Sequence, residues 1–118
     1  MFLIDEKDYE YRFGDSGPKY LIRGPRINFG LVRLKAGEDF DPHIHKVMEE
    51  NFYCLEGTVE VYVDGTPHTL TPGKFIHVEP NEAHYLINIS DKPVLCAFSL
   101  GPSMEDDKYV VDKPEMLK

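Results

Sequence analysis

A two-residue alternation of apolar and polar side chains is the feature that most constrains the fold of this chain. Between Thr58 and Val63 it places three valines on one face of the backbone and Thr, Glu and Tyr on the other, as in a half-buried β-strand. Asp64-Gly65 follows directly, and this dipeptide is favoured in two-residue hairpin turns. The sequence therefore predicts an antiparallel hairpin whose second strand is Thr66–Leu70.

Similar short runs recur along the chain, and turn-forming residues separate them. No window has the apolar stripe of an amphipathic helix, and nine glycines and nine prolines are spread among the runs. Many short strands with turns between them indicate an all-β fold, either an antiparallel sandwich or a barrel. The other predicted strands are Tyr20–Arg23, Ile27–Leu34, Asn51–Glu56, Lys74–Val78, His84–Ile89 and Val94–Leu100.

Size and charge limit what the chain is expected to bind. Its 118 residues suffice for one domain, and 13 Lys and Arg against 21 Asp and Glu give a formal net charge of −8. This charge opposes nucleic-acid phosphates and anionic lipid head groups, so we expect neither nucleic acid nor membrane as a partner. No apolar run approaches the roughly 20 residues of a membrane span, and no secretory signal pattern begins the chain, so the expected location is the cytoplasm.

Three segments differ in their expected roles. Residues 1–26 are predicted to form strands or an arm that packs on the barrel or on a dimer partner. Residues 27–100 are predicted to form the barrel core, and residues 101–118 a polar tail or an edge strand. The two cysteines, Cys54 and Cys96, lie in apolar runs and are expected to be buried free thiols, with a disulfide or a reactive thiol as alternatives.

His43 and His45, separated by one residue, are the first candidate metal ligands. On a strand, residues two apart point to the same face, so both imidazoles can aim at one point. Glu50 begins the next strand run and shares a face with the apolar residues two and four positions further on. Its carboxylate would then point inward, where a metal would stabilise it. Glu49 falls on the opposite face and is expected to be solvated.

His84 is the fourth candidate donor. It shares a strand face with Leu86 and Asn88, and Asn88 could form hydrogen bonds in the interior. Three imidazoles and one carboxylate suit Mn, Fe, Co, Ni, Cu or Zn better than Ca or Mg, and the ligand types do not select one of these six. Four protein ligands around a metal that accepts five or six would leave positions for water or substrate.

The spacing of these residues resembles the first motif of the cupin superfamily. That motif reads G-x5-H-x-H-x3-4-E-x6-G, and Gly37, His43, His45, Glu50 and Gly57 match it completely. The agreement includes both glycines that frame the motif. It therefore extends beyond the three proposed ligands.

The second motif of that superfamily reads G-x5-P-x-G-x2-H-x3-N, and here the sequence matches at the two ends. Gly73, His84 and Asn88 stand at the expected places, after a spacer as short as that of small microbial cupins. Glu79 occupies the usual proline position and Asn81 the usual glycine position. Because Asn tolerates the left-handed backbone conformation, we expect the turn at Asn81 to be kept.

This resemblance covers roughly residues 27–100. It implies a double-stranded β-helix, or jelly-roll barrel, of six to eight strands with one divalent transition metal near its axis. By position it implies that His43, His45, Glu50 and His84 are the metal ligands. Many such proteins are homodimers, which would also cover exposed strand edges.

Several other residues have candidate roles in or around a pocket. His77 could act there as an acid or base, although a partly exposed strand histidine is the simpler expectation. One of Arg23, Arg26 and Arg33 could bind a substrate carboxylate. Phe52 and Leu86 are predicted to be pocket wall. Three tyrosines alternate with the inward positions and are expected outside the barrel or at an interface: Tyr53, Tyr62 and Tyr85.

Three functions are compatible with these features. The first is a metal-dependent enzyme that acts on a small carboxylate- or sugar-type metabolite by isomerisation or tautomerisation, decarboxylation or oxygen-dependent cleavage. The second is a non-catalytic module that binds a small-molecule ligand at the same metal site. The third is a structural barrel with a vestigial site.

Overall fold

The computed structural model describes residues 1–114, and within them almost every regular element is a β-strand. The exception is a short 3-10 turn, η1 (Glu6–Asp8). The strands are β1 (Gly17–Arg23), β2 (Asn28–Leu34), β3 (Asp39–Ile44), β4 (Glu49–Glu56), β5 (Val59–Val63), β6 (Thr66–Leu70), β7 (Phe75–Val78), β8 (His84–Ile87), β9 (Val94–Gly101) and β10 (Tyr109–Val110). The all-β prediction is confirmed, and each predicted strand run has a counterpart.

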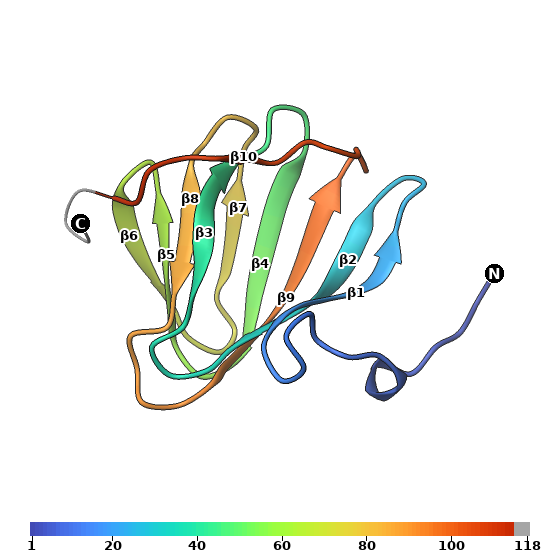
Figure 1. Cartoon of the computed structure of the whole chain (residues 1–118), viewed down its shortest axis with the longest axis horizontal. Helices are drawn as coiled ribbons and strands as arrows, with labels where there is room; N and C mark the ends of the chain where they lie inside the picture. The colour runs from blue at the N-terminus through green and yellow to red at the C-terminus, as the bar shows by residue number, and fades with distance from the viewer. Residues whose placement is uncertain (115–118) are drawn as a thin grey trace.

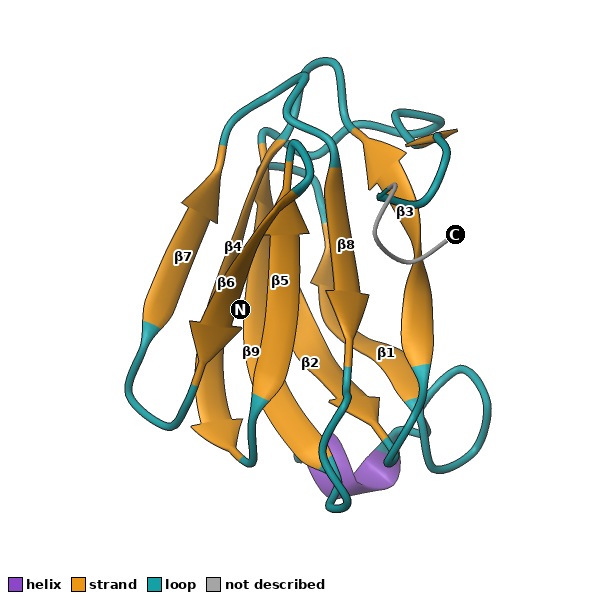
Figure 2. Cartoon of the chain, turned by 90° about the vertical axis from the view of Figure 1, so that its left-hand side faces the viewer, coloured by secondary structure: helices purple, strands orange, loops and turns teal. Residues whose placement is uncertain are grey.

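Two antiparallel five-stranded sheets form the molecule, with strand orders β1-β2-β9-β4-β7 and β10-β3-β8-β5-β6. The sheets lie face to face and enclose the interior of a jelly-roll barrel (Figures 1 and 2). The strand number exceeds the six to eight expected because β1 and β10 add one strand at an edge of each sheet. β1 pairs along its length with β2, so the segment before residue 27 contributes to the sheet itself.

The core lies between the sheets, as alternation along the strands predicts. In β9 every second side chain points inward, namely Val94, Cys96, Phe98 and Leu100, and each is at most 4% exposed. Cys54 lies opposite Cys96 across the β4–β9 pairing, and both thiols are free and buried. Burial raises the pKa of both thiols, which keeps them protonated and unreactive.

Left-handed backbone conformations occur where the sequence predicts tight turns. Asp64 and Gly65 have φ angles of 47° and 83°, the positive pair required at the centre of the β5–β6 hairpin. Gly57 has a φ of 78°, and a Cβ placed on it would lie 2.4 Å from the carbonyl oxygen of Pro93. Only glycine fits there, which explains the last position of the first motif.

The C-terminal segment returns over the second sheet of its own chain. β10 pairs with β3, with Tyr109 opposite Ile44 and Val110 opposite His43. Lys113 forms an ion pair with Asp39 and lies 5.9 Å from the ring centroid of Tyr85. The part of the predicted tail at residues 115–118 lies outside the described residues.

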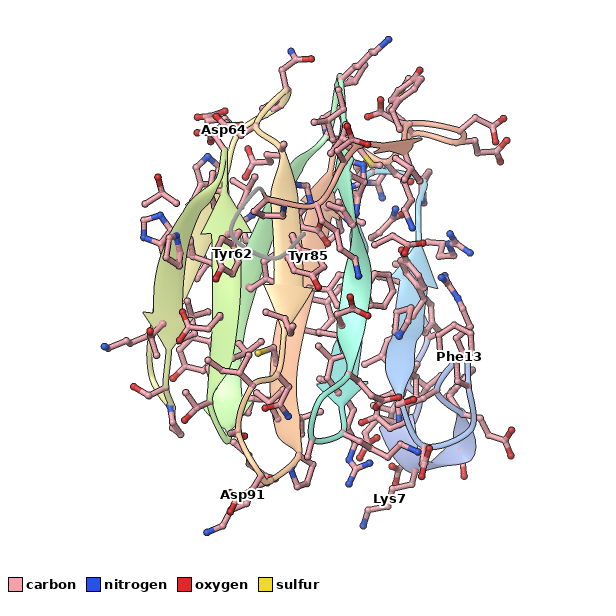
Figure 3. All side chains as sticks on the ribbon, turned by 60° about the vertical axis from the view of Figure 1, so that its left-hand side comes forward. Lys7, Phe13, Tyr62, Asp64, Tyr85 and Asp91 are labelled. Atoms are coloured by element: carbon pink, nitrogen blue, oxygen red, sulfur yellow. The ribbon has the colours of Figure 1, made fainter. Side chains whose placement is uncertain are left out.

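Tyr62 and Tyr85 lie side by side on the outer surface of β5 and β8 (Figure 3). Their position outside the barrel is as predicted, but both are buried, at 8% and 2% exposed. Tyr53 faces outward from β4 and is 43% exposed. Within residues 1–114, no helix has the length and apolar character needed to cross a membrane.

Candidate metal centre

Four side chains from three separate stretches of the chain meet at one end of the barrel. His43 belongs to β3, His45 follows that strand directly, Glu50 lies near the start of β4, and His84 begins β8. One potential ligand atom from each lies within 4.8 Å of the others, and all four residues are buried. The structure thus brings together the four residues that the sequence singled out as metal ligands.

Backbone carbonyls fix the orientation of all three imidazoles. The Nδ1 atoms lie 2.7 Å from the carbonyl oxygen of Asp41 for His43, 2.6 Å from that of Asp107 for His45, and 3.1 Å from that of Glu82 for His84. A carbonyl oxygen only accepts, so each Nδ1 carries the hydrogen and donates it. In a neutral ring, Nε2 is then left with a free lone pair.

These Nε2 atoms all face the same carboxylate oxygen. Oε1 of Glu50 lies 3.8 Å from Nε2 of His43, 3.1 Å from that of His45 and 2.9 Å from that of His84. Three lone pairs and a carboxylate therefore converge in a buried space. While all three rings are neutral, none of these four groups has a hydrogen to donate to another. A divalent cation among them would satisfy all four groups, so the donor set fits a metal ion.

The pKa values follow from burial and from these contacts. Burial alone would raise the pKa of Glu50, but the close contact with the three imidazoles outweighs it and holds that pKa well below its ordinary value. Burial lowers the pKa of His43. For His45, contact with Glu50 outweighs burial and the pKa is raised. Glu50 is thus ionised at neutral pH, as a metal ligand must be.

Asp107, from the C-terminal segment, anchors the loop that carries His45. Its carboxylate accepts hydrogen bonds from the backbone N–H groups of Lys46, Val47 and Met48 at 2.9–3.0 Å. Burial would raise the pKa of this carboxyl, but the three bonds lower it. The same residue's carbonyl holds the His45 ring, so Asp107 fixes both the loop and one imidazole. Nothing in the polar sequence around Asp107 pointed to this role.

A cavity of about 310 Å³ opens beside the cluster and is lined by His43, His45 and Glu50. Phe52 and Leu86 form part of its wall, as predicted. Arg23 lines it too, whereas Arg26 and Arg33 do not. Other lining residues were not singled out from the sequence, among them Arg12, Tyr20 and Lys108. These three lie in segments that precede or follow the motif-bearing strands.

His77 is not brought to the cavity. His77 lies on β7, opposite Asn51 of β4, and its neighbour Val78 takes the inward position. The Nδ1 atom of His77 lies 2.6 Å from Oδ1 of Asn51. Its Nε2 lies 3.1 Å from the Glu79 carboxylate, on the outer face of the sheet. This is the exposed strand position expected as the simpler alternative, because the two-residue period of β7 turns His77 away from the interior.

The turn before His84 keeps the shape that the second motif requires. Asn81 has a φ of 71°, so it adopts the left-handed conformation in place of glycine, as expected. Its backbone N–H donates to the carbonyl oxygen of His45 at 2.7 Å, which ties the two ligand-bearing loops together. Asn88 forms its interior hydrogen bonds at the other end of the barrel, with Leu34 and Lys92.

Known proteins share this fold and part of this sequence. The Cupin domain family matches residues 30–100. Over 48 residues the chain is 42% identical to quercetin 2,3-dioxygenase of Bacillus subtilis, which covers 41% of this chain and 14% of that protein. Over 75 residues it is 29% identical to L-ectoine synthase of Marinomonas sp., covering 62% and 57%. The chain thus spans less than two thirds of the length of these curated relatives.

Solved structures share the fold, and one of them is similar over nearly its whole length. It is an uncharacterised conserved protein with a double-stranded β-helix domain from Klebsiella pneumoniae, with a TM-score of 0.82 and 14% identity. The likeness covers 96% of this chain and 99% of that one. At this identity it supports the fold, which agrees with the two-sheet barrel described above.

Proposed function

The chain belongs to the cupin family, and from this premise we propose that it is a metal-dependent enzyme of small-molecule metabolism. In this proposal one divalent transition metal is bound by His43, His45, Glu50 and His84. The observation that carries it is the convergence of three Nε2 lone pairs and one ionised carboxylate beside a cavity large enough for a small molecule.

The donor set indicates which metals fit. Imidazole and carboxylate together favour Mn, Fe, Co, Ni, Cu or Zn, whereas Ca and Mg prefer oxygen ligands alone. When bound, such an ion acts as a Lewis acid that polarises an oxygen of the substrate. The hydrogen bonds that the three Nδ1–H groups donate to backbone carbonyls support the same assignment, because partners of this kind fix imidazole ligands in metal sites.

Residues of the cavity supply the rest of the chemistry. Apolar side chains, among them Phe40 and Phe52, would exclude water from a bound molecule. The phenol of Tyr20 lines the cavity, and burial raises its pKa, so it is protonated at neutral pH and available as a proton donor. A polarising centre with one proton donor favours isomerisation or tautomerisation among the reactions considered. The proposal includes the two partners expected from the sequence: the chain binds a small-molecule ligand and forms a homodimer.

A second candidate is a non-catalytic binding module that uses the same metal site. It is favoured by the outward position of His77, because among the described residues the cavity then has no imidazole beyond the metal ligands. The weaker acid-base group Tyr20 would be the main proton donor. A protein that only binds its ligand would need no better one.

Metal removal and reloading test the proposal. The full chain would be stripped with a chelator, reloaded separately with Mn, Fe, Co, Ni and Zn, and incubated with a panel of keto acids and enols followed by NMR. We expect turnover only with a metal, and neither metal nor turnover in Glu50→Gln, while the exposed His68→Ala control behaves as wild type. Ligand binding without turnover would favour the binding module, and a chain that retains none of these metals would overturn both.

A further inference from the structure

The cavity beside the cluster has positive charge that the protein does not neutralise. Arg12 and Arg23 both line it, and within residues 1–114 neither forms an ion pair with a carboxylate. This is unexpected in a chain with a formal charge of −8, where acidic partners are plentiful. Two unpaired guanidinium groups at one cavity are therefore available to an anion from outside.

Contacts with the barrel hold both arginines near this cavity. The guanidinium of Arg23 lies 4.1 Å from the ring centroid of Tyr20, whose ring packs edge-on against Phe98 at 5.2 Å. The backbone N–H of Arg12 donates to the carbonyl oxygen of Pro18 at 2.9 Å, which folds the N-terminal loop back onto β1. Tyr20, both arginines and the proposed metal ligands His43, His45 and Glu50 all line this one cavity.

The acidic side chains of the cavity are largely engaged elsewhere. Glu50 faces the three histidines, and the carboxylate of Asp107 accepts three backbone N–H groups. Asp106, the third lining acid, is exposed, and Lys108 adds a positive charge to the same lining. Positive charge therefore predominates on the side of Arg12 and Arg23, and a divalent ion at the cluster would add to it.

The wall between the charged groups is apolar. Val32, Phe40, Phe52, Leu86 and Leu100 line it, together with Phe98. A sugar acid would place several hydroxyl groups against these side chains, where they would lose hydrogen bonds to water without replacement. A flat, unsaturated or aromatic body would fill the same space at no such cost.

We propose that the substrate is a carboxylate with a flat apolar body, bound by Arg12 and Arg23 at one end and by oxygen donors to the metal site at the other. This inference rests on the proposed function and names the substrate class of the same site. Guanidinium groups bind carboxylates through paired hydrogen bonds, so the two arginines would set specificity. The metal-ligand assignment does not depend on them.

A pair of matched probes tests the inference. The full chain, loaded with Co²⁺ under argon, would be titrated with 3,4-dihydroxybenzoate and with its methyl ester, and binding followed by the visible absorption of the cobalt. Both probes present the same catechol oxygens and ring, and only the acid presents a distal carboxylate. The titrations would be repeated in Arg12→Gln, Arg23→Gln and, as a matched control, Arg26→Gln, an exposed arginine that does not line the cavity.

We expect the wild-type chain to bind the acid at least about tenfold more tightly than the ester, as a charged hydrogen bond typically contributes. In each cavity variant the acid should bind more weakly while the ester binds as before, so that most of this preference is lost. Arg26→Gln should keep the preference. Equal dissociation constants for the two probes, no binding of the acid, or a preference unchanged in both cavity variants would overturn the inference while leaving cobalt binding intact. Failure of the chain to bind cobalt would instead overturn the proposed function, and the inference with it.

Discussion

The two ends of this barrel differ in how they treat buried polar groups. Asp64 marks the end near the histidines and Asp91 the opposite end (Figure 3). At the Asp91 end Asn88 is fully buried, and its amide donates to the carbonyl oxygens of Leu34 and Lys92 while its oxygen accepts from Ser90. Every hydrogen-bonding atom of this amide group has a complementary partner within the chain.

At the other end, four buried polar groups converge with too few hydrogen-bond donors among them. The same strands reach both ends: along β4 the inward residues run from Glu50 through Phe52 to Cys54, and along β8 from His84 to Leu86. A polar group whose bonds are satisfied by its own chain supports the fold. A cluster of facing acceptors indicates a site that needs something from outside the chain.

Replacing the Glu50 carboxylate should have the largest effect on this difference between the two ends. Glu50→Gln keeps the side-chain shape but removes the charge, and we expect it to abolish retention of the metal. The loss should exceed the roughly 10- to 100-fold that removal of an outer-sphere partner costs, because a direct ligand is lost. Affinity would be measured by competition with a chromophoric chelator, with Glu49→Gln as control. Wild-type affinity in Glu50→Gln would show that Glu50 is not a metal ligand.

Truncation of a core side chain at the Asp91 end should have the opposite effect, a loss of stability without a loss of metal affinity. Leu34 is 3% exposed in the core near Asn88, and Leu34→Ala should lower the free energy of unfolding by about 2–5 kcal/mol through the cavity it leaves. Metal affinity should stay at the wild-type value. Urea unfolding gives the stability, with the exposed Ile89→Ala as control. A parallel loss of metal affinity would show that the two ends are not independent.

Asp107 offers a smaller, sharper test, because it acts on the metal site without entering it. Asp107→Ala removes the acceptor of three backbone N–H groups in the loop that carries His45. We expect metal affinity to fall by about 10- to 100-fold, and Asp107→Asn to lie between wild type and Ala. Asp106→Asn, one residue earlier and exposed, should change little, because Asn also tolerates the φ of 56° at this position. Equal effects of the Asp106 and Asp107 substitutions would contradict a positioning role.

Contacts on the outer surface of the barrel, between its two ends, should contribute least to the stability of the fold. Tyr85 donates a hydrogen bond to Asp39, and this bond holds the pKa of Asp39 below its ordinary value of 3.8. A lowered pKa means that the contribution to stability is present above that value and is lost as the pH falls through the lowered one. Tyr85→Phe should therefore cost about 1 kcal/mol or less at pH 7, since the carboxylate is partly exposed.

Urea unfolding of wild type and Tyr85→Phe at several pH values would check this. The difference between the two proteins should shrink progressively below about pH 4. A difference that is constant from pH 7 to pH 3 would show that the effect of the hydroxyl does not come from its hydrogen bond to the ionised Asp39 carboxylate. Metal affinity should be the same in both proteins at pH 7.

Local patterns predicted much of the fold and the four converging side chains. The alternation in β5 and the Asp64-Gly65 turn depend on neighbours in sequence, and so does the shared direction of His43 and His45. His84 lies 34 residues beyond Glu50; its place on a strand face made it the fourth candidate donor, and the resemblance to the second motif supported that choice. Periodicity alone could not have paired β3 with β8.

The residues that were not predicted act through long-range contacts that leave no periodic signal. Asp107 is one of several acids in a polar stretch, and its role depends on backbone N–H groups about 60 residues earlier. Arg12 and Tyr20 precede both motifs, and they reach the cavity because β1 joins the sheet edge beside β2. Their contribution follows from the path of the chain in space.

The central claim is that His43, His45, Glu50 and His84 bind a single metal ion, and anomalous diffraction from a crystal of the full chain tests it most directly. Data collected on both sides of a transition-metal absorption edge should give one peak about 2.0–2.2 Å from the three Nε2 atoms and the Glu50 carboxylate. A metal-reloaded crystal with no anomalous peak between these four side chains would contradict the account.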